Sequence, residues 1–183
     1  MCIRDRIYSI AGQLPKGRGL ISARPFRSPH HSASAAALAG GGTTFRPGEC
    51  SLADCGVLFL DELPEFSRDS LEVLRQPLED GQITVSRAAG SATYPSRFQL
   101  VAAMNPCKCG YYGHPTRPCT CSPSAVRQYR SRVSGPLLDR IDLCVEMDPV
   151  AFDELHTSTP AESSADLRKQ VLACLLYTSD AAD

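Results

Sequence analysis

Two largely apolar runs in the middle of the chain predict buried strands. Gly56–Leu60 is apolar throughout, and Phe98–Met104 is interrupted only by Gln99. Short apolar runs bounded by polar turn residues are typical of strands that are covered on both faces of a parallel sheet. A further strand is expected near Ile141–Met147. Because helical segments separate these runs, the pattern predicts an α/β fold.

Helices are expected on both sides of the first run. Ser32 is expected to cap an alanine-rich helix over residues 33–39, which stops at Gly40. A second helix is expected over Ser124–Val133. The segment up to about Gly19 contains glycine and proline and is expected to form a loop.

The stretch between the two apolar runs predicts a helix followed by a β-hairpin. Asp69, with Glu72 three residues later, is a candidate capping box. The helix that follows carries leucines on one face, at positions 71, 74 and 78. Residues 83–94 then contain two short strand-like stretches around a turn that includes a glycine, which is the pattern of a hairpin.

Length and composition are those of a single globular domain. The chain has 183 residues, of which 21% are charged and 43% hydrophobic, so disorder is excluded. No apolar run approaches the roughly 20 residues of a membrane helix, and the N-terminus lacks a secretory signal. We therefore expect a cytoplasmic protein without membrane contact.

Charge is unevenly distributed along the chain although the net charge is −1. Residues 1–50 carry seven basic residues against two acids, and residues 88–138 carry six basic residues and no acid. From residue 141 onward, nine acids face two basic residues. Basic blocks suit contacts to phosphate or nucleic acid, but a single charge is more often a solvated surface group. Charge alone leaves DNA binding and a solvated surface equally open.

Four of the nine cysteines form two tight pairs, and these predict a metal site. They are Cys107, Cys109, Cys119 and Cys121, and nine residues lie between the pairs. Four thiolates satisfy tetrahedral Zn²⁺ in a closed, structural site, and His114 is an alternative ligand. The competing interpretation is a loop of reduced, free cysteines, because the spacing is tighter than the usual C-x-x-C pattern. The neighbouring histidines His30 and His31 are expected to make loop or phosphate contacts instead of binding metal.

Polar residues end both apolar runs. Asp61 and Glu62 follow the first run in a Walker B pattern, in which one carboxylate holds Mg²⁺ and the next orients or deprotonates the attacking water. Asn105 follows the second run and could hold that water or a phosphate oxygen. Arg140 lies between acids and could act as an arginine finger in an oligomer. Taken singly, each residue is equally compatible with an ordinary turn or a surface pair.

Taken in order, these motifs resemble those of the magnesium-chelatase-like AAA+ proteins, and the ComM/YifB branch in particular. The resemblance covers about residues 7–150 and includes Gly56–Leu63, Pro77–Gly81, Ala102–Pro106 and Leu137–Arg140. Arg24–His31 and Arg46–Glu49 also look like signatures of that branch. The resemblance implies a P-loop NTPase parallel sheet with flanking helices, a helix-2 insert and a pre-sensor-1 β-hairpin.

The resemblance also assigns roles to these residues. Asp61 would bind Mg²⁺, Glu62 would be the catalytic carboxylate, Asn105 would be sensor 1, and Arg140 would act on the adjacent subunit of a homohexamer. The insert near 40–48 and the hairpin over 83–94 would face a central pore, so the candidate DNA contacts are Arg46 and Arg87. Arg87 could instead pair with Glu79 or Asp80 as a brace of the hairpin. The implied activity is ATP-driven movement along DNA, which supports branch migration in recombination and transformation.

The sequence departs from the family in one respect, because it contains no G-x-x-x-x-G-K-[ST] loop. Residues 15–19 lack that spacing, so we expect a partial domain that binds nucleotide poorly by itself. Residues 151–173 would begin the C-terminal lid, and residues 1–6 and 174–183 resemble adaptor or vector sequence. Two alternatives stay open: a chelatase-type ATPase motor subunit, and a zinc-stabilised nucleic-acid-binding module without catalysis. A phosphate-binding loop upstream would exclude the second.

Overall fold

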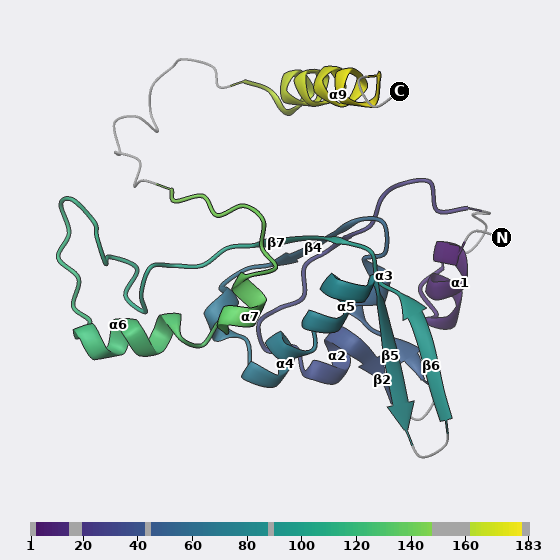
Figure 1. Ribbon diagram of the computed structural model, residues 1–183, viewed down its shortest axis with the longest axis horizontal. Coiled ribbons are helices and arrows are strands. Elements are labelled where there is room, and N and C mark those ends of the chain that lie inside the picture. Colours follow the sequence, from purple (N-terminus) through teal and green to yellow (C-terminus); the bar gives the residue numbers. More distant parts are fainter. Residues whose placement is uncertain (1–2, 15–19, 43–44, 88–89, 148–161, 181–183) are drawn as a thin grey trace. The chain divides into compact units, whose positions relative to one another are not determined.

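The computed structural model describes residues 3–14, 20–42, 45–87, 90–147 and 162–180 (Figure 1). The chain divides into two compact units, Met1–Val145 and Glu146–Asp183. The expected boundary between core and lid, at residues 150 and 151, lies outside the described residues, as does the 15–19 segment. Among the described helices, none combines the length and the apolar character needed to cross a bilayer.

A three-stranded parallel sheet forms the centre of the first unit. Its strands are β1 (Phe26–Arg27), β4 (Val57–Leu60) and β7 (Gln99–Ala102), in the order β1-β4-β7. The register pairs Phe26 with Val57 on one side of β4 and Leu60 with Ala102 on the other. Both predicted apolar strands are therefore confirmed, and they are direct neighbours.

A glycine at the start of β4 allows the strands to approach closely. A Cβ atom at Gly56 would collide with the carbonyl oxygen of Pro25, which accepts a hydrogen bond from the N–H of Val57 at 2.9 Å. Only glycine has no side-chain atom at this position, so it permits the first contact between β1 and β4.

Leucine side chains from the sheet and from four helices make up the hydrophobic core. The helices are α2 (Ala35–Ala39), α4 (Arg68–Glu72), α5 (Arg75–Asp80) and α7 (Gly135–Leu138). The residues of the cluster that are at most 2% exposed include Leu38, Leu58, Leu60, Leu63, Leu71, Leu74 and Leu137. Each fully buried leucine stabilises the fold by about 1.5–3 kcal/mol relative to an exposed one, so this cluster fixes the sheet.

The single helix expected to carry Leu71, Leu74 and Leu78 is divided into α4 and α5, and the helix caps differ from the expected residues. Ser34 caps α2 and Ser67 caps α4, and each side-chain oxygen accepts an N–H three residues ahead. The predictions of Ser32 and Asp69 as caps were wrong, because several adjacent residues can cap and tertiary packing selects among them. The expected stop of α2 at Gly40 is confirmed, and Gly81 ends α5 in a left-handed conformation.

Two antiparallel hairpins lie beside each other in the first unit (Figure 1). The predicted hairpin is formed by β5 (Gln82–Arg87) and β6 (Gly90–Pro95). The second is formed by β2 (Gly40–Gly41) and β3 (Arg46–Pro47). The hydroxyl of Tyr94 donates a hydrogen bond to the carbonyl oxygen of Phe45, which joins the two hairpins.

Four further elements lie between or after those already named. They are α3 (Glu49–Leu52), a 3-10 turn η1 (Leu63–Glu65), α6 (Pro123–Arg130) and α9 (Ser164–Asp180). The predicted helix after the cysteine pairs is confirmed as α6, which begins after its cap at Ser122.

Two expectations about the ends of the first unit were wrong. The segment expected to be a loop begins with helix α1 (Ile3–Ile10), which buries Ile7 and Asp5, and Asp5 Oδ1 accepts the N–H of Ile21 at 3.0 Å. Residues 141–147 form no strand, and Leu143, Val145 and Met147 are at least 75% exposed. An apolar sequence favours a strand, but a strand also needs a hydrogen-bonding neighbour, and none of the described strands pairs with this segment.

Candidate functional site

The carboxyl ends of the three parallel strands meet at one edge of the sheet. Residues 28–31 follow β1, Asp61 and Glu62 follow β4, and Asn105 lies three residues beyond β7. Because all three strands run in the same direction, these segments leave the sheet at the same edge. In open α/β sheets this edge is where ligands bind. We call residues 28–31, 61–62 and 105 the carboxyl edge.

Glu62 has a constrained backbone and a defined side-chain neighbour. Its φ and ψ angles are 52° and 47°, which is the left-handed region that a glutamate rarely adopts. The N–H of Glu62 donates a hydrogen bond to Asp61 Oδ1 at 2.8 Å. Glu62 Oε2 lies 3.2 Å from Nδ1 of His31, and the two side chains are 48% and 35% exposed. The carboxylate is thus held towards the segment that follows β1.

A shallow depression of about 420 Å³ lies over these groups, lined by Ser28, Pro29, His30, His31, Asp61 and Glu62. The imidazole rings of His30 and His31 lie 4.0 Å apart between centroids, and His31 also meets the buried Phe66 edge-on. These contacts hold His31 from two sides. The depression therefore combines two carboxylates with two histidines on a rigid strand edge.

Sequence reasoning did not find the contact between His31 and Glu62. It took Ala23–His31 as an extended stretch and the two histidines as loop residues, and it did not pair that stretch with β4. Only the pairing of β1 with β4 brings His31 beside Glu62. A single sequence gives little indication of which strands pair in parallel and therefore end at the same edge of the sheet.

The structure separates Arg140 from the carboxyl edge of its own chain. The guanidinium of Arg140 pairs with Glu79 of α5 and also donates to the carbonyl oxygen of Pro136. Asn105, in contrast, is exposed at the edge where it was expected. A role of Arg140 in a neighbouring subunit stays a prediction.

The two arginines proposed to contact DNA lie on the adjacent hairpins. Arg46 is exposed on β3. Arg87 ends β5, and its side chain lies outside the described residues. Glu79, one of the two acids considered as a partner for Arg87, forms an ion pair with Arg140.

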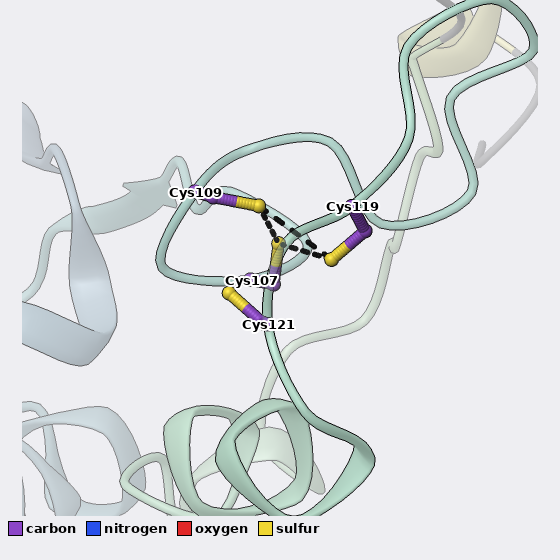
Figure 2. Close-up of side chains that lie close together, drawn as sticks. All are labelled: Cys107, Cys109, Cys119 and Cys121. Carbon is purple, nitrogen blue, oxygen red and sulfur yellow. Dashed lines mark hydrogen bonds between the residues drawn. The ribbon is translucent and has the colours of Figure 1, made fainter.

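The four paired cysteines converge in space, as the spacing predicts (Figure 2). Their sulfur atoms all lie within 4.8 Å of one another, and Cys107 is fully buried. Hydrogen bonds from the backbone N–H groups of Tyr111 and Thr120 lower the pKa of the Cys109 thiol to about 5. His114 is not part of this group, and its Nδ1 accepts the N–H of Arg117 at 3.1 Å. We call residues 106–121 the cysteine loop.

A parallel α/β sheet with an acidic strand end and flanking helices is the architecture of a partial AAA+ domain. The chain belongs to the family described as magnesium chelatase, subunit ChlI, whose profile matches residues 2–155. This confirms the family that the motifs in the sequence resemble.

Individual relatives support the same assignment. The protein YifB of Escherichia coli K12 is 54% identical over 82% of this chain and 29% of its own length. The competence protein ComM of Haemophilus influenzae is 54% identical over 81% of this chain and 29% of its own. The magnesium-chelatase subunit ChlI of Porphyra purpurea is 36% identical over 38% of this chain and 20% of its own.

The chain spans about 29% of the length of YifB and ComM. Among solved structures, NtrX from Brucella abortus in complex with ADP aligns with a TM-score of 0.37 and 20% identity. That alignment covers 44% of this chain and 19% of NtrX.

Proposed function

We propose that the full-length protein hydrolyses ATP at the carboxyl edge and uses the energy to move along DNA. The observation that carries the ATPase part is the pair Asp61–Glu62 at the end of a buried strand, with Glu62 in a left-handed conformation beside His31. A strained residue whose side chain is held towards a depression is a common feature of active sites. The family membership supports the same reaction.

Magnesium and ATP are the cofactors that this proposal requires. The residues fit a hydrated Mg²⁺, since carboxylate oxygens are its usual protein ligands and Asp61 and Glu62 both line the depression. Bound there with nucleotide, Mg²⁺ would neutralise charge on the phosphate oxygens. Asp61 would hold the ion, and its Oδ1 also accepts the N–H of Glu62, which fixes the spacing of the two acids.

In this proposal Glu62 orients and deprotonates the attacking water, and His31 orients Glu62. A carboxylate that is 48% exposed can rotate freely unless a neighbour restrains it. The imidazole at 3.2 Å supplies that restraint and can also take part in proton movement at Oε2. Asn105 is assigned to the water or the terminal phosphate from the neighbouring strand end.

Work on DNA is favoured over metal insertion by the surface charge. All six basic residues of the acid-free stretch are exposed: Arg97, Lys108, Arg117, Arg127, Arg130 and Arg132. A basic surface of this kind attracts a polyanion such as DNA, although Arg132 is already paired with Glu65 at 3.1 Å. The similarity to a competence protein along 81% of the chain points in the same direction. The protein would act as a homohexameric ring that drives branch migration in recombination and transformation. In such a ring Arg140 would act on the nucleotide of the adjacent subunit.

Glu62→Gln in the full-length protein tests the catalytic part. ATP binding should persist, while hydrolysis should fall by about 10²–10⁴-fold, which is the usual contribution of a general base. Asp69→Asn is the matched control, because it neutralises an exposed acid of α4 outside the depression. Binding is measured with a fluorescent nucleotide and turnover by phosphate release. Turnover of Glu62→Gln equal to that of the control would remove Glu62 from catalysis.

DNA-stimulated hydrolysis separates the two motor functions. We expect duplex or branched DNA to raise the turnover of the unmodified protein and porphyrin to leave it unchanged. Stimulation by porphyrin alone would favour the chelatase alternative.

A further inference from the structure

We propose that Cys107, Cys109, Cys119 and Cys121 bind one Zn²⁺ per chain in a closed, structural site. Figure 2 shows the sulfur atoms of Cys107, Cys109 and Cys119 facing one another, and Cys121 Sγ lies within 4.8 Å of all three. They come from two ends of a loop that brings residue 107 to residue 121. No step of the proposed ATPase reaction uses these residues, so the site is independent of that function.

Three of the six sulfur–sulfur distances are close to those of a tetrahedral tetrathiolate, and Cys121 Sγ lies within 4.8 Å of the other three sulfurs. Zinc–sulfur bonds of about 2.3 Å place the sulfur atoms of a regular tetrahedron about 3.8 Å apart. The Cys107–Cys109, Cys107–Cys119 and Cys109–Cys119 distances are 3.3, 3.7 and 3.5 Å. All exceed the roughly 2.05 Å of a disulfide bond, and the four cysteines are free thiols. The cluster therefore has the size of a metal site in which the ligands are already gathered.

Apart from the cysteines, exposed contacts and local hydrogen bonds hold the cysteine loop, such as those that His114 Nδ1 accepts from the N–H groups of Thr116 and Arg117. Cys107 is the only buried residue between positions 106 and 121, and the loop contains no helix or strand. Two tyrosines make cation–π contacts, with Arg117 over Tyr111 and Arg130 over Tyr112, but all four side chains are partly or fully exposed. Exposed contacts of this kind contribute about 0.5–1 kcal/mol each. Ordering a loop of this length costs far more, and a bound metal would supply the difference.

The position of the cluster indicates that the metal would link two elements of the fold. Cys107 lies two residues after Asn105 of the carboxyl edge, and Cys121 directly precedes Ser122, the cap of α6. The metal would therefore tie the end of β7 to the start of α6. A hydrogen bond from Arg130 Nε to the carbonyl oxygen of Pro106, at 3.1 Å, spans the same junction.

An all-sulfur, four-ligand set selects zinc and excludes a catalytic use. Mg²⁺ and Ca²⁺ prefer oxygen ligands, so neither suits this set. A catalytic zinc keeps one position for water, whereas four protein ligands fill the tetrahedron. Iron is the competing thiophilic ion, and the experiment below distinguishes it by element and by colour.

Metal analysis of the full-length protein, purified under reducing conditions without added metal, tests the site. We expect about one zinc per chain, and less than about a tenth of an equivalent in the double variant Cys119→Ser/Cys121→Ser. Cys144→Ser is the matched control, because Cys144 is a free, exposed cysteine outside the cluster and should leave the zinc content unchanged. Less than a tenth of an equivalent of any metal in the unmodified, fully reduced protein would overturn the proposal. Iron at one equivalent would overturn the assignment to zinc.

Trypsin provides a second readout that does not depend on the stability of a variant. Lys108 is exposed, but it lies between two of the proposed ligands, so cleavage after it requires the loop to open. We expect chelation to accelerate cleavage after Lys108 and added Zn²⁺ to reverse it, while cleavage after Lys169 on α9 stays constant. Equal cleavage after Lys108 with and without chelator would contradict the role of the metal in holding the loop. ATP hydrolysis is not measured here, so this test can fail while the proposed function stands.

Discussion

The carboxyl edge and the cysteine loop adjoin each other in the chain but are stabilised in different ways. The edge is built on buried leucines of β4 and its helices, which position Asp61 and Glu62 whether or not a ligand is bound. The loop buries one cysteine, and its shape depends on four side chains that converge. Residues of the carboxyl edge can therefore be substituted without loss of the fold. Substitution of a cysteine ligand, in contrast, would change the structure of the cysteine loop.

Arg140→Ala is expected to have the largest effect, and it would show that the carboxyl edge is incomplete within one chain. If the arginine reaches a neighbouring subunit, its loss should lower hydrolysis by about 10³–10⁵-fold. Glu79→Gln is the matched control, since it removes the ion pair of Arg140 and keeps the arginine. Mixing Arg140→Ala with Glu62→Gln subunits should restore part of the phosphate release.

A different result would contradict a site that is shared between subunits. No recovery at any mixing ratio, together with the same loss in Glu79→Gln, would make Arg140 a structural partner of α5. The zinc content of both variants should stay at the unmodified level, because neither residue belongs to the cysteine loop.

His31→Ala should have a smaller effect and would sharpen the difference between edge and loop. Loss of a group that orients a catalytic residue typically lowers activity by about 10- to 100-fold. We expect kcat to fall while the Kd for ATP and the zinc content stay unchanged, and His31→Gln to recover part of the loss. Asp69→Asn, which changes an exposed residue of α4 outside the depression, is the control. A fall in ATP affinity without a change in kcat would assign His31 to nucleotide binding instead.

Substitution of the hairpin arginines should have the smallest effect, and only on DNA. Arg46→Ala or Arg87→Ala should flatten the slope of log affinity against log salt by about 0.7 for a single strand, with equal weakening for all sequences. Lys169→Ala is the control, as it removes an exposed cation of α9. An unchanged slope in both arginine variants would make the two hairpins a structural brace.

The sequence alone predicts the strands best, because their signal is local. Buried apolar runs and the leucine spacing of α4 and α5 are independent of distant residues, and two of the three strands predicted from apolar runs are present. The four cysteines are found by spacing alone, because each pair has the form Cys-x-Cys. Asp61 and Glu62 are located by their position at the end of a strand.

The sequence did not predict the features that depend on how a segment packs or pairs with the rest of the chain. The cap of α2 falls on Ser34, where the Oγ atom accepts the N–H of Ala37, and serines two residues apart look alike in a sequence. The 141–147 segment has the composition of a strand but has no neighbour to pair with among the described strands. His31 reaches Glu62 only through the register between β1 and β4, which no local pattern encodes.

The left-handed backbone of Glu62 lowers the thermal stability of the fold, while its carboxylate is needed for the proposed hydrolysis. A residue other than glycine in this conformation costs about 1–3 kcal/mol, so Glu62→Gly relieves strain and removes the carboxylate at once. A variant library sorted only for survival on heating would therefore enrich glycine at position 62 and discard the proposed reaction. Engineering a more durable form of this protein has to keep the strain at that one position and gain its stability elsewhere.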